Sequence, residues 1–302
     1  MVSSSNGYEE LLDKVPRLRS RNNVFALSGG LTNINLKVET DSGNYVARIS
    51  SNKSELLAID RKAEYENSKI AASVGVGAPV YDFLPDSGLL VIGYLEGRTF
   101  EANDVAANLS RIASSLRQLH AAPAFVRDFD MFLIQQNYLK IVSDSNFKLP
   151  PNYLKYASHI QQMKQALAVL DEGKVACNND LLPANFIDDG KKIWLIDYEY
   201  SGNNDACFEL GNIWSEADLP DEALEELVTS YYGKSRPEKI ARAWLLALLA
   251  KYGWSLWASI QNGISELDFD FWQWGMHRFE YAATAFDSKK FEQALLRVST
   301  TN

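Results

Sequence analysis

The pattern of apolar and polar positions changes near residue 96. Before this point the chain contains short apolar or alternating runs, separated by turns with glycine, aspartate and serine, which is typical of antiparallel strands. A helical pattern over residues 54–73 interrupts these runs. We therefore predict an antiparallel sheet with one inserted helix, and strands at 24–27, 34–39, 45–49, 79–83 and 89–95.

Beyond residue 100 the apolar residues recur mainly with helical spacing, over 105–120, 152–170, 221–232, 237–261 and 268–286. One strand-rich segment, 175–198, interrupts the helices, and its Asp188-Asp189-Gly190 sequence predicts a hairpin turn. The chain is therefore expected to be an α+β protein with two lobes, residues 1–95 and 96–302. Ligands usually bind in the cleft between such lobes.

Composition narrows the function classes. The 302 residues carry a net charge of −9, which argues against a nucleic-acid-binding protein because such proteins present a basic face. No apolar run approaches the ~18 residues of a membrane span, and the polar start lacks a signal core. Cys177 and Cys207 are too few for a disulfide framework and lack the spacing of a zinc site. We expect a cytoplasmic protein without membrane insertion, and the oligomeric state stays open.

The strongest chemical signal is a pair of carboxylates and an amide around the predicted hairpin. Asp180 and Asn185 precede the hairpin, and Asp197 follows Asn185 by twelve residues, so that the turn folds Asp197 back beside Asn185. Carboxylate and amide oxygens are hard ligands suited to Mg²⁺. Phosphoryl transfer needs this set, because a metal neutralises phosphate charge and a carboxylate orients or deprotonates the attacking hydroxyl. Single residues of this kind often only decorate turns, but their combined spacing favours catalysis.

Two stretches resemble the choline/ethanolamine kinase family, within the wider aminoglycoside-phosphotransferase and protein-kinase-like fold. They are Asn179-Asp180-Leu181-Leu182-Pro183-Ala184-Asn185-Phe186 and Ile196-Asp197-Tyr198-Glu199-Tyr200-Ser201-Gly202, the second continuing through residues 208–212. The resemblance implies a two-lobed fold with an antiparallel-sheet N-lobe and a mainly helical C-lobe. It also implies that Asp180 is the catalytic base, that Asn185 and Asp197 hold Mg²⁺, and that ATP is the phosphoryl donor.

The resemblance further implies a nucleotide site in the first lobe. Arg48 matches the basic residue that grips phosphate in the family, and Glu64 on the following helix is placed to pair with it, with Glu66 as a nearby rival. Adenine is expected to bind main-chain groups of Gly93 and Leu95 in the linker between the lobes. A glycine turn alone is only a hairpin signal, but its backbone N–H groups can approach phosphate. The implied phosphate-covering loop includes Ser28, Gly29, Gly30, Thr32 and Asn33.

Tryptophans near the C-terminus point to the acceptor. Trp254 and Trp257 are three residues apart and therefore share one helix face. A quaternary ammonium has no hydrogen-bond donor, so aromatic faces and nearby carboxylates bind it. The pair resembles the tryptophans that wall the choline pocket in the family, and Glu216 falls where the family places a carboxylate near choline. We interpret Trp272 and Trp274 as core residues.

Two positions depart from the usual pattern of the family. Asn178 stands where the family has His, and Glu209 stands where it has Asp. Because that His mainly braces the loop in the wider fold, we expect the polar Asn178 to substitute for it. His120 and His277 show no partner in the sequence and are expected to be structural.

The sequence thus predicts an ATP- and Mg²⁺-dependent kinase that phosphorylates the hydroxyl of choline or ethanolamine. An aminoglycoside, a sugar or another amino alcohol is an alternative acceptor on the same fold, against which the tryptophan pair argues. A non-catalytic kinase-like binding module is an alternative of a different class. The substitution at position 178 supports that alternative, and the retained base and metal-binding residues oppose it.

Overall fold

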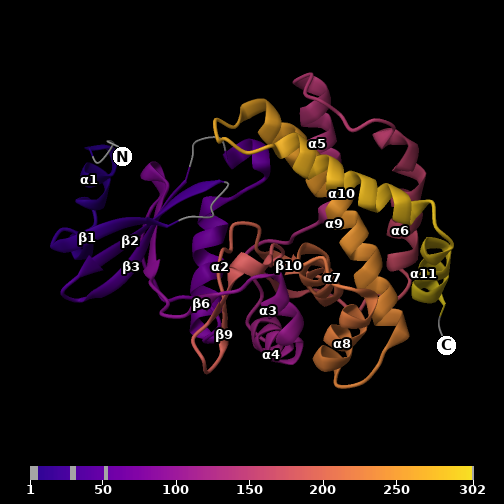
Figure 1. Cartoon of the computed structure of the whole chain (residues 1–302), viewed down its shortest axis with the longest axis horizontal. Coiled ribbons are helices and arrows are strands. Elements are labelled where there is room, and N and C mark those ends of the chain that lie inside the picture. The colour runs from indigo at the N-terminus through magenta and orange to yellow at the C-terminus, as the bar shows by residue number, and fades with distance from the viewer. Residues whose placement is uncertain (1–5, 28–31, 51–53, 301–302) are drawn as a thin grey trace.

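The protein is described by a computed structural model that covers residues 6–27, 32–50 and 54–300. Figure 1 shows a sheet-containing lobe next to a larger helical lobe, with the N-terminus on the first and the C-terminus at the far end of the second. This arrangement confirms the predicted fold class, an α+β protein with an antiparallel-sheet N-lobe and a helical C-lobe.

The N-lobe is built on an antiparallel sheet with the strand order β1-β2-β3-β5-β4 in the described part of the chain. The predicted turns are where the strands reverse, and Gly88 has the positive φ of 60° that the turn before β5 requires. A short helix, α1 (Asn6–Leu12), lies at the start of this lobe. The strands are β1 (Arg21–Leu27), β2 (Asn33–Thr40), β3 (Gly43–Ser50), β4 (Val80–Leu84) and β5 (Leu89–Gly93).

The inserted helix begins later than predicted. Residues 54–57 form a separate 3₁₀ turn, and α2 extends over Arg61–Ser73. Asp60 caps α2, because its side chain accepts hydrogen bonds from the backbone N–H groups of Lys62 and Ala63. This cap starts the helix at Arg61 and places Arg61 and Glu64 on its first turn.

The C-lobe contains the predicted helices and several that the pattern did not reveal. The predicted helix 105–120 is interrupted at Asn108 and forms two helices. The helix at 206–216 was missed because a short buried apolar segment does not distinguish a helix from a strand. The C-lobe helices are α3 (Ala102–Ala107), α4 (Leu109–His120), α5 (Met131–Asp144), α6 (Ala157–Leu167), α7 (Ala206–Glu216), α8 (Asp221–Tyr232), α9 (Pro237–Ile264), α10 (Phe271–Phe286) and α11 (Lys289–Ser299).

Short strands surround the predicted hairpin. β8 (Phe186–Asp188) and β9 (Ile193–Leu195) form the hairpin, and β6 (Arg98–Thr99) pairs with β8. β7 (Val175–Cys177) pairs with β10 (Gly202–Asn204), so the segments before Asp180 and after Asp197 lie side by side. The topology therefore brings the two halves of the chemical motif together.

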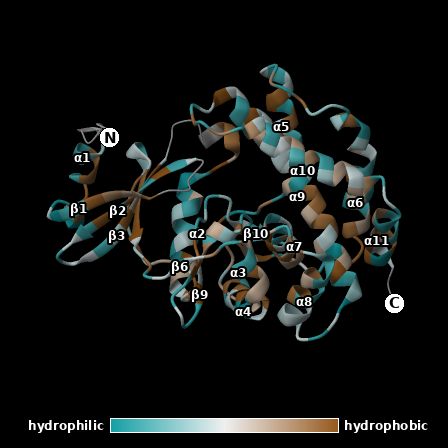
Figure 2. Ribbon diagram, in the orientation of Figure 1, coloured by the Kyte–Doolittle hydropathy of each residue, from teal (hydrophilic) through white to brown (hydrophobic). Residues whose placement is uncertain are grey.

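Helix α9 runs through the centre of the C-lobe and is buried along most of its length, while α5, α7, α10 and α11 pack against it (Figures 1 and 2). Gly211 on α7 allows a close approach, because a Cβ atom there would lie 2.1 Å from the carbonyl oxygen of Ala243. This contact fixes Glu216, at the end of α7, relative to Trp254 and Trp257 on α9. Within the described residues, no helix is long and apolar enough to cross a bilayer.

Candidate active site

A buried carboxylate holds the backbone of the loop that carries Asp180. Glu209 on α7 is fully buried, and its Oε1 accepts hydrogen bonds from the backbone N–H groups of Asn178 (2.6 Å) and Asn179 (3.0 Å). Its Oε2 lies 2.5 Å from His120 Nε2. His120 therefore has a structural position, as the sequence suggested, and the side chain at position 209 fixes the backbone just before Asp180.

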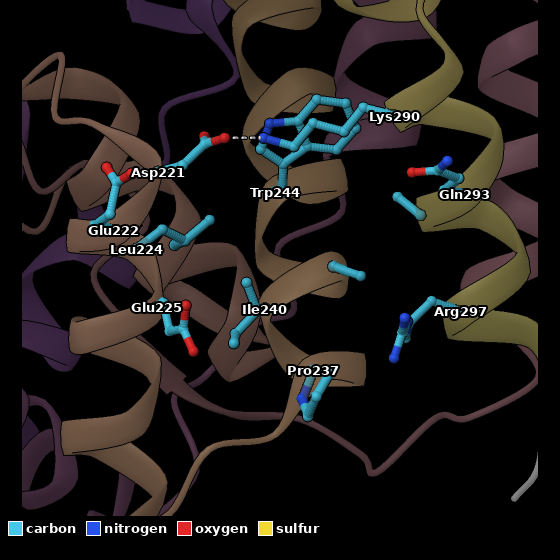
Figure 3. Close-up of a pocket in the computed structure, with 12 residues that line it drawn as sticks. Asp221, Glu222, Leu224, Glu225, Pro237, Ile240, Trp244, Lys290, Gln293 and Arg297 are labelled. Atoms are coloured by element: carbon cyan, nitrogen blue, oxygen red, sulfur yellow. Dashed lines mark hydrogen bonds and ion pairs between the residues drawn. The ribbon is translucent and has the colours of Figure 1, made fainter.

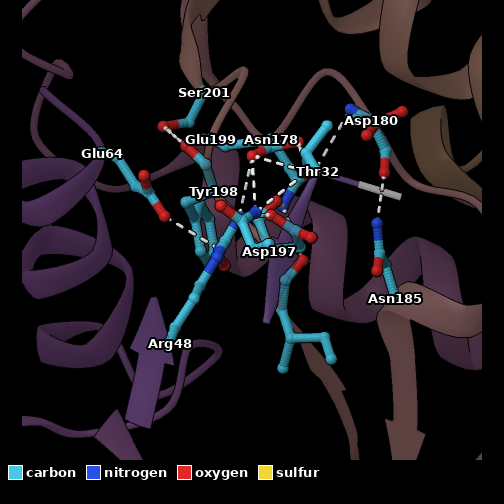
Figure 4. Close-up of polar contacts among 12 residues, drawn as sticks. Thr32, Arg48, Glu64, Asn178, Asp180, Asn185, Asp197, Tyr198, Glu199 and Ser201 are labelled. Atoms are coloured by element: carbon cyan, nitrogen blue, oxygen red, sulfur yellow. Dashed lines mark hydrogen bonds and ion pairs between the residues drawn. The ribbon is translucent and has the colours of Figure 1, made fainter. Parts of the chain in front are cut away.

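Asn178 connects the segment that carries Asp180 to the segment that carries Asp197 (Figure 4). Its side-chain amide donates to the carbonyl oxygens of Ile196 (3.0 Å) and Asp197 (2.9 Å), and its Oδ1 accepts from the backbone N–H of Asp180 (3.1 Å). This asparagine thus braces the loop, which is the part that the sequence assigned to it.

Asn185 and Asp197 are brought together by the hairpin. The backbone N–H of Ile196 donates to the carbonyl oxygen of Asn185 at 3.0 Å. Asn185 Nδ2 donates to the carbonyl oxygen of Asp180 at 2.7 Å, which leaves its Oδ1 available as an oxygen ligand. Asp180, Asn185 and Asp197 line the same cavity, so the structure gathers the oxygen donors that the spacing predicted.

Arg48 on β3 joins the lobes. Its guanidinium contacts Glu64 Oε1 (2.8 Å) on α2 and Asp197 Oδ1 (2.7 Å) in the C-lobe. Burial acts to lower the pKa of Arg48, but the carboxylates of Asp197, Glu64 and Glu199 raise it overall. The rival Glu66 pairs with Lys69 on the helix surface instead. The expected pairing of Arg48 with Glu64 is therefore present.

Glu199 is a site residue that the sequence analysis did not single out. Its buried carboxylate accepts hydrogen bonds from Thr32 Oγ1 (2.9 Å), Asn33 Nδ2 (2.9 Å), Arg48 Nη2 (2.9 Å) and Arg61 Nη1 (3.2 Å). Burial acts to raise the pKa of Glu199, but the two arginines lower it overall. Its place two residues after Asp197, within the Ile196–Gly202 run that resembles the family, was the available signal.

The phosphate-covering loop is only partly described. Thr32 and Asn33 lie at the start of β2 and point toward Glu199, whereas the predicted Ser28, Gly29 and Gly30 lie outside the described residues. Arg61 Nη2 also donates to Asn33 Oδ1 at 3.0 Å, so a second guanidinium belongs to this cluster.

The carboxyl groups of Asp180 and Asp197 share a region of negative charge. Burial and the neighbouring Asp197, Glu199 and Glu216 carboxylates raise the pKa of Asp180 well above its usual value. Burial also raises the pKa of Asp197, to about 6, although Arg48 acts in the opposite direction. A site of this kind favours a bound cation.

Next to β5, a small cavity of about 20 Å³ lies beside Arg48 and Asp197 and is lined by the apolar side chains of Ala78, Leu90, Ile92 and Ile196, among others. The predicted linker residues, Gly93 and Leu95, lie at the end of β5 and just beyond it. The N–H of Gly93 donates to the carbonyl oxygen of Pro79 (2.8 Å), and Leu95 follows Tyr94, whose N–H donates to Asn44. Their contacts with adenine stay a prediction.

Aromatic side chains line part of the main cavity, which has a volume of about 120 Å³. Trp254 and Trp257 line it as predicted, and Trp257 Nε1 donates to Tyr200 Oη at 2.9 Å. Trp274 packs against the hydrophobic core, as interpreted from the sequence, but it also lines the cavity. Trp272 is half-buried elsewhere, with Lys148 Nζ 5.3 Å from its ring centroid. Spacing alone did not reveal which of these two α10 residues faces the cavity.

Glu216 also lines this cavity, and its Oε2 accepts a hydrogen bond from Arg278. A larger cavity, of about 400 Å³, lies between α8, α9 and α11 and has charged rims formed by residues such as Glu225 and Arg297 (Figure 3). It contains none of the predicted site residues. The chemical groups are therefore concentrated in the cavity between the lobes.

Comparison with known proteins supports the resemblance to the choline/ethanolamine kinase family. The model of the choline/ethanolamine kinase family matches residues 24–232. Ethanolamine kinase 1 of Mus musculus is 28% identical over 276 residues, which cover 78% of this chain and 75% of that protein. An aminoglycoside phosphotransferase solved with ADP and hygromycin B, 15% identical with a TM-score of 0.60 over 93% of this chain and 99% of its own, shares the fold.

Two solved structures are more similar. A choline/ethanolamine kinase family protein from Mesorhizobium loti has a TM-score of 0.85 and 28% identity, covering 96% of this chain and 97% of its own. The choline kinase LicA from Streptococcus pneumoniae has a TM-score of 0.77 and 26% identity, covering 92% and 98%. Because the family model matches more than half of its length, this chain belongs to the choline/ethanolamine kinase family.

Proposed function

We propose that this kinase transfers the γ-phosphoryl group of ATP to the hydroxyl of choline in a Mg²⁺-dependent reaction. One observation carries the proposal: a single cavity is lined both by Asp180, Asn185 and Asp197 and by the indoles of Trp254 and Trp257. The oxygen groups suit the hydroxyl of choline, and the indoles suit its methylated ammonium.

The residues between the lobes fit a metal–nucleotide complex. Asn185 Oδ1 and the Asp197 carboxylate would hold Mg²⁺, and Glu199 adds a third oxygen donor to the same cluster. When bound, Mg²⁺ neutralises charge on the phosphates. Arg48, positioned by Glu64, would bind the phosphates from the N-lobe side.

The phosphate-covering loop and the linker complete the proposed nucleotide site. Thr32 and Asn33 belong to this loop, together with the predicted Ser28, Gly29 and Gly30. Adenine would lie next to the main chain of Gly93 and Leu95, near the apolar side chains of Leu90 and Ile92. A solved LicA structure, 25% identical to this chain, is a complex with AMP, which supports adenine nucleotide binding.

Asp180 is the proposed base. A general base works best when its pKa lies near the operating pH, and burial together with neighbouring carboxylates raises the pKa of Asp180 in that direction. Its carboxylate orients the acceptor hydroxyl and accepts its proton. The transfer is direct, because positioning and electrostatic stabilisation supply the rate without a covalent enzyme intermediate.

Ethanolamine is the second candidate acceptor. Glu216 Oε1 is buried and has no hydrogen-bond partner among the described residues, so an ammonium N–H would find an acceptor there. Ethanolamine kinase 1 is also among the named relatives. The indoles favour choline, because a methylated cation is less costly to desolvate against aromatic faces.

A coupled ADP-release assay over choline, ethanolamine and their methylated intermediates tests the proposal. We expect Mg²⁺-dependent turnover with kcat/KM highest for choline, and none with Asp180→Asn. Turnover that favours ethanolamine would move the assignment to the second candidate. Turnover of a sugar or an aminoglycoside alone would overturn the proposal.

A further inference from the structure

An ion pair lies directly behind the acceptor end of the cavity. Glu216 ends α7, and Arg278 projects from α10; their side chains are only 5% and 12% exposed. Arg278 Nη2 donates to Glu216 Oε2, whereas Oε1 is buried and has no hydrogen-bond partner in the part of the chain that the structure describes. Glu216 lines the cavity, so one carboxylate oxygen is held by the protein, and the buried Oε1 is the one whose hydrogen-bonding capacity is left for a ligand.

Arg278 also contacts the aromatic wall. Its Cζ atom lies 3.3 Å from the ring centroid of Trp274, a distance at which the guanidinium covers the indole. The two residues are four apart on α10 and so share one helix face. Trp274 lines the cavity with Trp254 and Trp257. One guanidinium thus fixes both the carboxylate and the third indole.

A second cation lies behind the same carboxylate. Lys251 on α9 is buried, donates to the carbonyl oxygen of Ser215 at 2.9 Å and lies 3.8 Å from Asp218 Oδ1. Burial lowers the pKa of Lys251, although the negative charge of Glu216 opposes this. Lys251 and Arg278 are therefore two positive charges close enough to Glu216 to offset its negative charge.

We propose that Arg278 sets the selectivity of the pocket for a methylated ammonium over a primary ammonium. This inference rests on the proposed function. A primary ammonium brings three N–H groups that need acceptors, and Arg278 leaves it one oxygen of Glu216. A quaternary ammonium brings none and is bound by indole faces, one of which Arg278 holds in place. Arg278 is a positioning residue that acts through Glu216 and Trp274.

Substitution of Arg278 tests the inference in a two-by-two design. Arg278→Met should lower the kcat/KM preference for choline over ethanolamine by about tenfold or more, because a freed carboxylate oxygen can accept a charged N–H. The change should lie in the acceptor KM and leave the KM for ATP unchanged. In a Glu216→Gln background the same substitution should change the preference less, because only the contribution through Trp274 remains. Arg278→Lys, which retains the cation, should restore most of it.

Two probes without a hydroxyl separate this inference from the proposed function. Tetramethylammonium and ethylammonium cannot be phosphorylated, and their binding is followed by tryptophan fluorescence in wild type and in each variant. We expect Arg278→Met to weaken tetramethylammonium and strengthen ethylammonium. Arg297→Met, an exposed arginine on α11, is the matched control and should change neither (Figure 3).

The outcomes are distinct. If the probes bind as expected but no acceptor is phosphorylated, the proposed function fails and the role of Arg278 stands. An equal loss of both probes in Arg278→Met would mean a purely structural role and overturn the inference, as would a wild type that binds neither probe. If Arg278→Met does not fold, Arg278→Gln retains a donor toward Glu216 without the charge. It should shift the ratio in the same direction by about three- to tenfold.

Discussion

Glu209 offers the sharpest test of how the catalytic loop is held. Glu209→Ala removes the acceptor of two buried backbone N–H groups, those of Asn178 and Asn179, and the partner of His120. Each unsatisfied N–H costs about 1–3 kcal/mol, and a hydrogen bond to a charged group contributes about 1.5–3 kcal/mol. Some water entry will offset part of this, so we expect a loss of roughly 3–6 kcal/mol in the free energy of unfolding.

Glu209→Gln retains one oxygen for the two N–H groups and should cost only about 1–2 kcal/mol. Urea denaturation measures both losses, and steady-state kinetics should show that the Ala variant loses kcat more than it raises either KM. Glu225→Ala, at an exposed position on α8, is the control and should change little. An Ala variant within about 1 kcal/mol of wild type would refute the reasoning, since at least one N–H would then have another partner.

The contacts of Glu209 also argue against a metal site at this position. His120, Cys177 and Glu209 present ligand atoms within 4.8 Å of one another, as a metal site would. However, both Glu209 oxygens already accept hydrogen bonds, and His120 Nδ1 lies 2.7 Å from Tyr231 Oη. Because these groups satisfy one another, we interpret the cluster as a hydrogen-bond network that braces the loop.

Four further predictions concern the chemistry. Asp180→Asn should lower kcat by ~10²–10⁴-fold with ATP binding and the melting temperature nearly unchanged; a variant that keeps a third of the wild-type kcat would exclude its role as the base. Turnover should need Mg²⁺ or Mn²⁺ with Ca²⁺ poor, measured after chelation, and full activity in excess chelator would contradict this. Asn178→His should change kcat by less than about tenfold, because the residue braces a loop; a hundredfold rise would favour the binding-module alternative. Trp254→Ala or Trp257→Ala should raise the KM for choline about ten- to hundredfold, and the Phe variants less; variants that lose stability at constant KM would show that the indoles only pack.

Local signals in the sequence predicted the elements that depend on local pattern. The alternating strands, the hairpin and the helix at 221–232 were expected, because turn residues and an amphipathic stripe mark them directly. Helix α7 was not, because its short buried segment does not distinguish a helix from a strand, whereas the longer buried helix α9 was recognised by its length. The burial of α7 is set by α8 and α9, which are packed by tertiary contacts.

The residues of the candidate site also form two groups, those related by a local hairpin and those brought together by the tertiary fold. Asp180, Asn185 and Asp197 could be placed together because one hairpin relates them. The contacts of Glu199 with Thr32 and Arg61 join segments 167 and 138 residues apart, so they depend on how the lobes meet. No local pattern encodes that arrangement.

The backbone around the proposed base is fixed by hydrogen bonds, which bears on the alternative of a module that only holds ligand. Asn179 and Asp197 have positive φ angles of 69° and 64°, a left-handed region that Asn and Asp adopt more readily than other residues with a side chain. Asn179 is held there by its amide, which donates to the carbonyl oxygens of Cys177, Tyr200 and Gly202. These positions adjoin the proposed base and coincide with the proposed metal ligand. Because these hydrogen bonds and those of Asn178 fix the loop, we expect the geometry around Asp180 to be preorganised, which favours a catalytic site over a module that only binds ligand.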